Sequence, residues 1–146
     1  MSKIVPSAFI SSTVEDLEPF RMAAKEAALT AGFHPVMMDY FAVQSAKRPY
    51  ATCMAEVDTC DVLVVIVAHR YGWQPLDQPE GGKKSITWLE CEHAETRVEV
   101  LSFVVDEKYA WPERLRESHR LSKAVDEGTL TADLPADVQE SVIKMR

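Results

Sequence analysis

Asp-Val-Leu-Val-Val-Ile-Val-Ala, at residues 61–68, is the strongest structural signal in this sequence. Its β-branched residues favour an extended strand. The run has no alternating polar residues, which is typical of a strand that is covered on both faces, and such strands lie inside parallel sheets. We therefore expect residues 61–68 to form the central strand of a parallel sheet.

Shorter apolar runs alternate with helical patterns on both sides of this stretch. The other predicted strands are residues 4–10, 33–38 and 98–105, and the predicted helices are residues 14–31, residues 50–57 and the segment that contains Glu90. Repeated alternation of strand and helix predicts an α/β protein. We expect a flavodoxin-like, doubly wound parallel sheet of four to five strands, with helices on both faces.

The pattern changes after residue 105, where the sequence becomes more polar. We interpret residues 1–105 as the α/β domain and residues 106–146 as a helical tail that completes or flanks it. Within the tail we expect a helix from Pro112 to about Val125, a break at Gly128 and a last helix from Pro135.

Composition and charge argue against several classes of partner. The net charge is −7 over 146 residues, and Lys and Arg gather only in short pairs such as Lys47-Arg48 and Lys83-Lys84. A nucleic-acid backbone needs a basic surface, so we expect no nucleic-acid partner. No apolar run approaches the roughly 18 residues of a membrane span, so we expect no membrane partner.

The cysteines and histidines give no metal or disulfide signal. The three cysteines, Cys53, Cys60 and Cys91, form no Cys-x-x-Cys pair, which argues against a common zinc spacing and against a disulfide framework. His34 and His93 have no neighbouring metal ligands in the sequence. We predict no metal site and a cytoplasmic location.

Glu90 is the candidate catalytic residue. On a helix that starts near Ile86, Glu90 falls near the middle of the apolar arc, whereas Glu92 falls outside it. An inward carboxylate is costly unless it is hydrogen-bonded, paired or protonated. Glu90 therefore belongs to a functional site, or it has a structural role in which it caps a nearby helix end or pairs with an arginine such as Arg70 or Arg97.

Three segments after predicted strands carry candidate ligand-binding residues, since ligands of open α/β sheets bind beyond the carboxyl ends of the strands. Ser11, Ser12 and Thr13 follow the first strand, where hydroxyl and backbone N–H groups suit a phosphate or a ribose. The same three residues are equally typical of an ordinary helix N-cap. The sequence has neither of the glycine-rich phosphate loops GxGxxG and GxxxxGK[ST], which argues against a dinucleotide-fold dehydrogenase and a P-loop NTPase.

The second and the central predicted strands are followed by the other candidates. His69, Arg70 and Tyr71 follow the central strand and combine a cation with an aromatic ring, which suits a phosphate and a base. Ion pairing of Arg70 and packing of Tyr71 under the long loop would explain them equally well. The segment Asp39, Tyr40 and Phe41 occupies the matching position after the second strand.

Four segments of the sequence resemble the family known as domain of unknown function 4062. They are Phe-Ile-Ser-Ser-Thr-Val-Glu-Asp-Leu at 9–17 with Arg21, Glu-Val-Asp-Thr-Cys-Asp at 56–61, His-Arg-Tyr-Gly at 69–72, and Lys-Ser-Ile-Thr-Trp-Leu-Glu at 84–90 with Ala94. The resemblance covers roughly the first 105 residues. The family is regarded as TIR-like and often precedes larger signalling NTPases of the STAND type, so the resemblance implies a TIR-like fold and a role in signalling.

The resemblance also bears on the glutamate. TIR domains and the similar nucleoside deoxyribosyltransferases carry an active glutamate on the helix after the third strand. The transferase pattern Gly-Thr-x-x-Glu-x-Gly-x-Ala fits Thr87, Glu90 and Ala94, with Glu92 in place of the second glycine. The TIR pattern Trp-x-x-x-Glu instead starts at Trp88 and selects Glu92. The position of Glu90 on the apolar face of the helix favours Glu90 and leaves Glu92 as the fallback. Ser85 and Thr87 of this motif are further ligand candidates.

These observations lead to two main hypotheses. In the first, a TIR-like effector or signalling domain binds a nucleotide or nucleoside such as NAD and cleaves its N-glycosidic bond through Glu90, with no cofactor required. In the second, a non-catalytic TIR-like module assembles with itself or with a partner signalling domain. A third hypothesis is a flavin-binding redox domain on the same fold.

Overall fold

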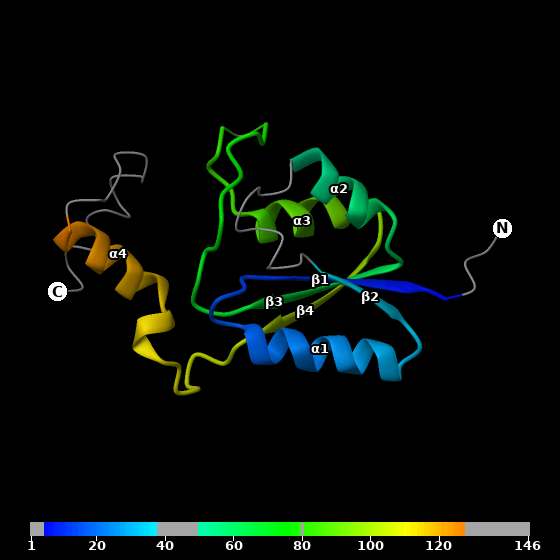
Figure 1. The fold of residues 1–146 in the computed structure, drawn as a ribbon, viewed down its shortest axis with the longest axis horizontal. Helices are drawn as coiled ribbons and strands as arrows, with labels where there is room; N and C mark the ends of the chain where they lie inside the picture. The colour runs from blue at the N-terminus through cyan, green and yellow to red at the C-terminus, as the bar shows by residue number, and fades with distance from the viewer. Residues whose placement is uncertain (1–4, 38–49, 80, 128–146) are drawn as a thin grey trace. The chain divides into compact units, whose positions relative to one another are not determined.

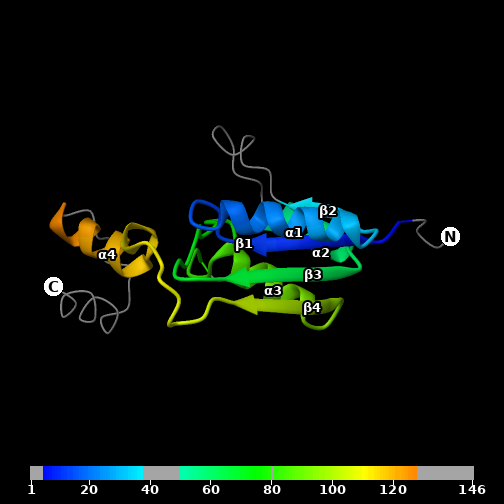
Figure 2. The same cartoon turned by 90° about the horizontal axis from the view of Figure 1, so that it is seen from below.

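The structure is a computed structural model that describes residues 5–37, 50–79 and 81–127. It forms two compact units, residues 1–106 and 107–146. The first unit contains a four-stranded parallel sheet in the order β2-β1-β3-β4 (Figures 1 and 2). The strands are β1 (Ser7–Ser12), β2 (His34–Met37), β3 (Val62–Val67) and β4 (Glu99–Val104). The helices of this unit are α1 (Glu18–Thr30), α2 (Tyr50–Asp58) and α3 (Ile86–Ala94).

Helices lie on both faces of the sheet, which confirms the flavodoxin-like α/β fold expected from the sequence. Helix α1 lies on one face, and α2 and α3 lie on the other (Figure 1). The main core lies under α2 and α3, where Leu63 and Val65 of β3 pack with Phe9, Val57 and Ala94. The alternating side chains of β3 explain this placement, because every second residue points to the same face.

The face of the sheet that carries α1 is only partly covered within the first unit. Helix α1 contacts β1 and β2. Beside it an open groove of about 820 Å3 runs over β3 and β4, with Val62, Val64, Ile66 and Leu101 among its lining residues. The sequence predicts β3 as a strand covered on both faces. Its interior position in the sheet is confirmed, but among the described residues of the first unit no helix covers β3 on this side.

The first helix starts later than the sequence predicts. Helix α1 begins at Glu18 rather than near residue 14, and its N-cap residue, Leu17, makes no side-chain cap. The hydroxyl of Thr13 instead donates to Asp16 Oδ1 at 2.6 Å, and the chain turns before the helix begins. Pro19 lies in the first turn, where its missing N–H costs no helical hydrogen bond.

The second unit contains a short 3-10 helix, η2 (Glu113–Leu115), followed by α4 (Glu117–Asp126). Trp111 and Leu121 are its buried apolar residues among those described. The predicted break at Gly128 and the predicted helix from Pro135 lie outside the described residues. Among the helices that the structure describes in either unit, none has the length and apolar character to cross a membrane.

Candidate functional site

Buried polar side chains gather where the chain leaves β1. Ser11, Ser12, Thr13 and Asp16 are all buried there. The loop after β3 approaches the same point, because a Cβ atom added at Gly72 would lie 2.9 Å from Thr13 Cγ2 and 4.0 Å from Ser85 Cβ. Gly72 also has a φ of +95°, which side-chain-bearing residues rarely adopt. The segments after β1 and β3 therefore meet the start of α3 at the carboxyl edge of the sheet.

Glu90 lies inside this region. It sits one turn after Ile86 on α3 and is only 3% exposed. Its partner is the hydroxyl of Ser11, which donates to Glu90 Oε2 at 2.5 Å. The ion pairs considered from the sequence do not form, because Arg70 pairs with Glu15 at 2.8 Å and Arg97 with Asp58 at 3.3 Å. The hydroxyl-to-carboxyl contact joins α3 to β1.

Burial controls the protonation of Glu90. Loss of hydration raises the pKa of this carboxyl from 4.5 to about 7, and the nearby charge of Glu56 adds to the increase. The hydrogen bond from Ser11 and the positive charge of Arg21 act in the opposite direction. Near neutral pH the carboxyl is therefore divided between its protonated and ionised forms, which suits a group that takes part in acid-base or carboxylate chemistry.

Arg21 is a member of the site that the sequence argument did not select. It is 4% exposed, and its Nη1 donates to Ser12 Oγ at 2.8 Å and to the Ser12 carbonyl at 3.4 Å. A signal for it was present in the sequence. Arg21 lies on the same helix face as Ala24 and Ala28, so it interrupts an apolar stripe in the way that Glu90 does on α3.

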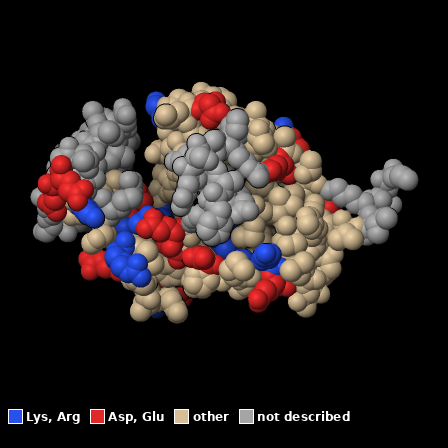
Figure 3. Space-filling model, viewed as in Figure 1, with Lys and Arg blue, Asp and Glu red and all other residues tan. Residues whose placement is uncertain are grey.

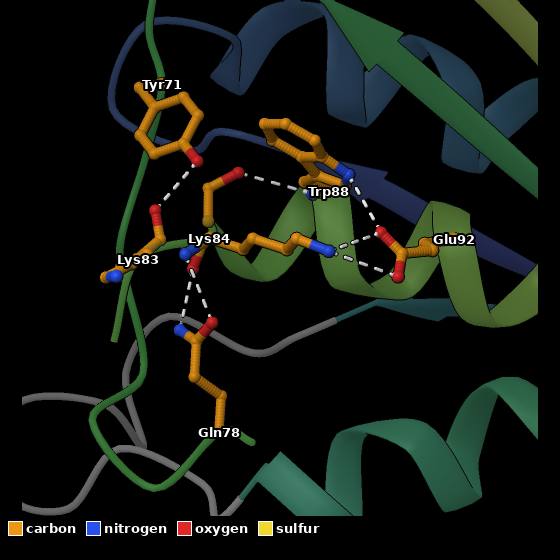
Figure 4. Close-up of polar contacts among 7 residues, drawn as sticks. Tyr71, Gln78, Lys83, Lys84, Trp88 and Glu92 are labelled. Atoms are coloured by element: carbon orange, nitrogen blue, oxygen red, sulfur yellow. Dashed lines mark hydrogen bonds and ion pairs between the residues drawn. The ribbon is translucent and has the colours of Figure 1, made fainter. Parts of the chain in front are cut away.

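Glu92 has a different environment from Glu90 (Figure 4). Its carboxylate accepts hydrogen bonds from Lys84 Nζ at 2.9 and 3.2 Å and from Trp88 Nε1 at 3.0 Å. Lys84 Nζ also lies 5.4 Å from the centroid of the Trp88 ring. These contacts, led by the hydrogen bond from Lys84, lower the pKa of Glu92. Glu92 is therefore a surface carboxylate in a network of its own.

The ligand candidates after β1 are mostly occupied by contacts within the protein. Ser12 Oγ donates to the Thr13 carbonyl at 2.7 Å, and Thr13 Oγ1 donates to Asp16. Ser11 is the one of the three that contacts Glu90. The hydroxyls of Ser12 and Thr13 shape the turn into α1, although neither caps the helix itself.

The candidates near β3 and α3 divide between loop contacts and the helix start. Arg70 binds Glu15, and the hydroxyl of Tyr71 donates to the Lys83 carbonyl at 3.0 Å (Figure 4). Ser85 is the N-cap of α3 and accepts from the Trp88 N–H at 3.2 Å. The Thr87 hydroxyl is buried and has no hydrogen-bond partner among the described residues. His69 is half-buried in the same loop.

Asp39, Tyr40 and Phe41 lie outside the described residues. Within the described ranges, no group of three or more His, Cys, Asp or Glu side chains is arranged to hold a metal ion. His93 bonds to Asp58 at 2.8 Å, and Cys53, Cys60 and Cys91 are not joined in a disulfide. On the face shown in Figure 3, the Lys and Arg residues that are described are interspersed with Asp and Glu.

Comparison with known proteins supplies a family but no activity. No curated protein matches the chain. Residues 7–141 match the model of the family described as domain of unknown function 4062, so the match covers both the sheet and most of the second unit. The chain belongs to the family of domain of unknown function 4062.

Proposed function

We propose that this chain is a TIR-like effector domain that binds a nucleotide or nucleoside of the NAD type and cleaves its N-glycosidic bond through Glu90. One observation carries the proposal: Glu90 is a buried carboxyl with a pKa near neutrality, held by Ser11 at the carboxyl edge of a parallel sheet. Ligands of open α/β sheets bind at this edge. A cytoplasmic role in signalling is part of the same proposal.

The chemistry requires a carboxylate close to the anomeric carbon. When the glycosidic C–N bond of NAD breaks, its electron pair leaves with the nicotinamide, which departs as a neutral base without needing a proton. The sugar is left with positive charge, which a carboxylate stabilises directly or captures as an ester. Water then adds to the anomeric carbon and releases a proton. Ionised Glu90 supplies the negative charge, and no second acid is required.

Thr87 supports the proposal from a separate observation. Its buried hydroxyl has no partner among the described residues and lies three positions before Glu90 on α3. Residues three apart on a helix share a face, so a ligand beside Glu90 would also meet this hydroxyl. Buried hydroxyls are normally hydrogen-bonded, which makes Thr87 a candidate contact for a ribose or a base.

A second function is favoured by the enclosure of Glu90. The carboxyl is 3% exposed and already bonded to Ser11, as expected for a residue that ties α3 to β1 in a non-catalytic assembly module. Such a module would associate with itself or with a partner signalling domain. Catalysis, by contrast, requires a neighbouring group to move aside so that the ligand can reach the Oε atoms.

The two functions differ in what the protein does to NAD. The test incubates the purified chain with NAD and with a panel of nucleosides, and measures release of the free base by chromatography. We expect release by the wild type, a decrease of about a hundredfold or more for Glu90→Gln, and no decrease for the matched variant Glu92→Gln. Circular dichroism establishes that both variants are folded.

Each outcome separates the hypotheses. Absence of release by folded wild-type protein, together with no calorimetric binding of any compound in the panel, contradicts the proposal and favours the assembly module. Binding without release retains the ligand site but removes the catalytic role. Release that persists in Glu90→Gln and is lost in Glu92→Gln transfers the role to the surface carboxylate.

A further inference from the structure

The two edges of the sheet differ in how they resist pairing with another strand. β2 has four residues and includes Pro35, which has no N–H to donate to a neighbouring strand. β4 has six residues and contains neither Pro nor Lys. Figure 2 shows β4 as the outermost strand on its side of the sheet. An apolar edge of this length is a template for strand addition.

The side chains of β4 are unusually exposed for apolar residues. Leu101, Phe103 and Val104 are 45%, 59% and 72% exposed, respectively. Leu101 and Phe103 point to the side of the sheet that carries α1, where they also line the open groove. Val104 has the opposite orientation, because side chains alternate along a strand. Exposed apolar residues therefore flank the edge on both faces of the sheet.

The hydrogen-bond pattern identifies the main-chain groups on the outer edge of β4, which pairs with no other strand among the described residues. The Val105 N–H donates to the Val67 carbonyl of β3 at 3.0 Å. Along a strand, the N–H and C=O groups of successive residues point to alternate sides. The odd-numbered residues of β4 therefore face β3, and Val100, Ser102 and Val104 present their N–H and C=O groups outward.

We propose that a second copy of this chain pairs with β4 in antiparallel orientation, about a two-fold axis at Ser102. In this register Val100 lies opposite Val104 of the second copy, and Leu101 lies opposite Phe103 of the second copy. The outward main-chain groups then meet one another. An interface in which both copies use the same surface must be self-complementary. This register meets the requirement, because the Val100–Val104 and Leu101–Phe103 pairs are apolar and Ser102 faces Ser102 at the axis.

Neighbouring registers fit less well. Moving the axis to Leu101 places Glu99 opposite Phe103 of the second copy. A slip of the register by one residue, which moves the axis to a point between two residues, would pair outward groups with inward ones. The proposed contact is a strand-to-strand interface of modest area, which corresponds to a reversible dimer rather than an obligate one. It is independent of any activity at Glu90.

Ser102→Pro tests the main-chain contact in the full chain. The Ser102 N–H points outward, so proline removes a donor from the free edge and none from the β3–β4 ladder. We expect wild type and the matched variant Ser102→Ala to show a concentration-dependent monomer–dimer equilibrium by analytical ultracentrifugation. Ser102→Pro should keep the wild-type circular dichroism spectrum and raise the dimer dissociation constant by about tenfold or more.

A cysteine at the axis tests the register. Residues opposite one another in a hydrogen-bonded antiparallel pair have Cα atoms about 5.5 Å apart, within the range of a disulfide. Under mild oxidation, Ser102→Cys should form a disulfide-linked dimer. Thr30→Cys, on exposed α1, and the wild type with its three native thiols should not.

The outcomes are decisive in both directions. Wild-type chain that remains monomeric at the highest soluble concentration overturns the proposal. So does a dimer that Ser102→Pro leaves intact, or one in which Thr30→Cys crosslinks as readily as Ser102→Cys. A dimer weakened by Ser102→Pro but not crosslinked by Ser102→Cys means that Ser102 does not lie opposite Ser102 of the second copy, and this overturns the stated register.

Discussion

Two carboxyl groups on α3, Glu90 and Glu92, lie two residues apart and have opposite environments. Glu90 is buried against β1, and loss of hydration raises its pKa to about 7. Glu92 is exposed, and its contacts with Lys84 and Trp88 lower its pKa. Two positions along a helix correspond to a rotation of about 200°, so Glu90 and Glu92 cannot lie on the same face of α3.

The comparison shows that the same side chain becomes a different chemical group according to the helix face it occupies. The ordinary pKa of Glu92 is lowered by contacts that salt can screen, and its side chain is half exposed. Glu90 has lost its hydration and accepts a hydrogen bond from the Ser11 hydroxyl, so its protonation responds to pH in the neutral range. A site that depends on proton uptake near neutrality can be built at Glu90 and not at Glu92.

The largest predicted effect is on the pH dependence of stability in Glu90→Gln. Because the folded-state pKa of Glu90 is raised from 4.5 to about 7, its stabilising protonated form is fully present below 4.5 and is lost as the pH rises through 7. The loss amounts to about 3 kcal/mol. Glutamine cannot ionise and still accepts from Ser11, so Glu90→Gln should be more stable than wild type at pH 8.

Chemical denaturation at several pH values measures this effect. The free energies of unfolding of wild type and Glu90→Gln should agree below about pH 4.5, separate progressively between pH 4.5 and 7, and differ by a constant amount above pH 7. Glu92→Gln serves as the matched control on the same helix and should follow the wild-type profile in the neutral range. A Glu90→Gln variant that is less stable than wild type at pH 8 would show that ionised Glu90 stabilises the fold.

A smaller effect is predicted for Ser11→Ala. Removal of the hydroxyl takes away the hydrogen bond that favours the ionised form of Glu90, so the pKa of Glu90 should rise further. The free energy of unfolding should fall by about 1 kcal/mol. Carbon NMR titration of the glutamate carboxyls measures the first change, and denaturation measures the second.

Ser7→Ala is the control for this substitution. Ser7 lies at the opposite end of β1, and its hydroxyl makes weaker contacts, with the Thr59 carbonyl at 3.4 Å and Asp61 Oδ2 at 3.5 Å. It should leave the titration of Glu90 unchanged. An unchanged Glu90 pKa in Ser11→Ala would mean that burial alone sets the protonation of this carboxyl.

Most of the fold can be predicted from sequence because strands and helices leave local patterns. The continuous β-branched run identified β3, and each of the other predicted strands overlaps an observed one. The start of α1 was misplaced because Thr13 is typical of a helix N-cap, whereas in the structure its hydroxyl contacts Asp16 and the helix begins at Glu18. Whether helices pack on both faces of β3 depends on parts of the chain that are distant in sequence, so the local pattern of β3 does not predict it.

The candidate site was only partly predictable for the same reason. The helical pattern indicated that Glu90 points inward, but it could not identify Ser11, 79 positions away, as its hydrogen-bond partner. Arg21 was part of the family resemblance but was not chosen as a site residue, because a single charge on a helix is usually solvated through its long side chain. The folded chain buries it instead, with its guanidinium on Ser12.

The smallest effect is predicted for the exposed network, in Lys84→Met. Loss of the ammonium group removes the strongest influence on Glu92, so the pKa of Glu92 should rise toward its ordinary value. The contacts of the Lys84 main chain with Gln78 do not involve the substituted side chain, so the loop should retain its anchor (Figure 4). Exposed ion pairs contribute little to stability and are screened by salt.

NMR titration should therefore show the Glu92 shift at low salt, a smaller difference from wild type at high salt, and an unchanged Glu90 titration, with Lys83→Met as the neighbouring control. Movement of the Glu90 pKa in Lys84→Met would show that the two carboxyls are coupled and would remove the contrast between the two faces of α3.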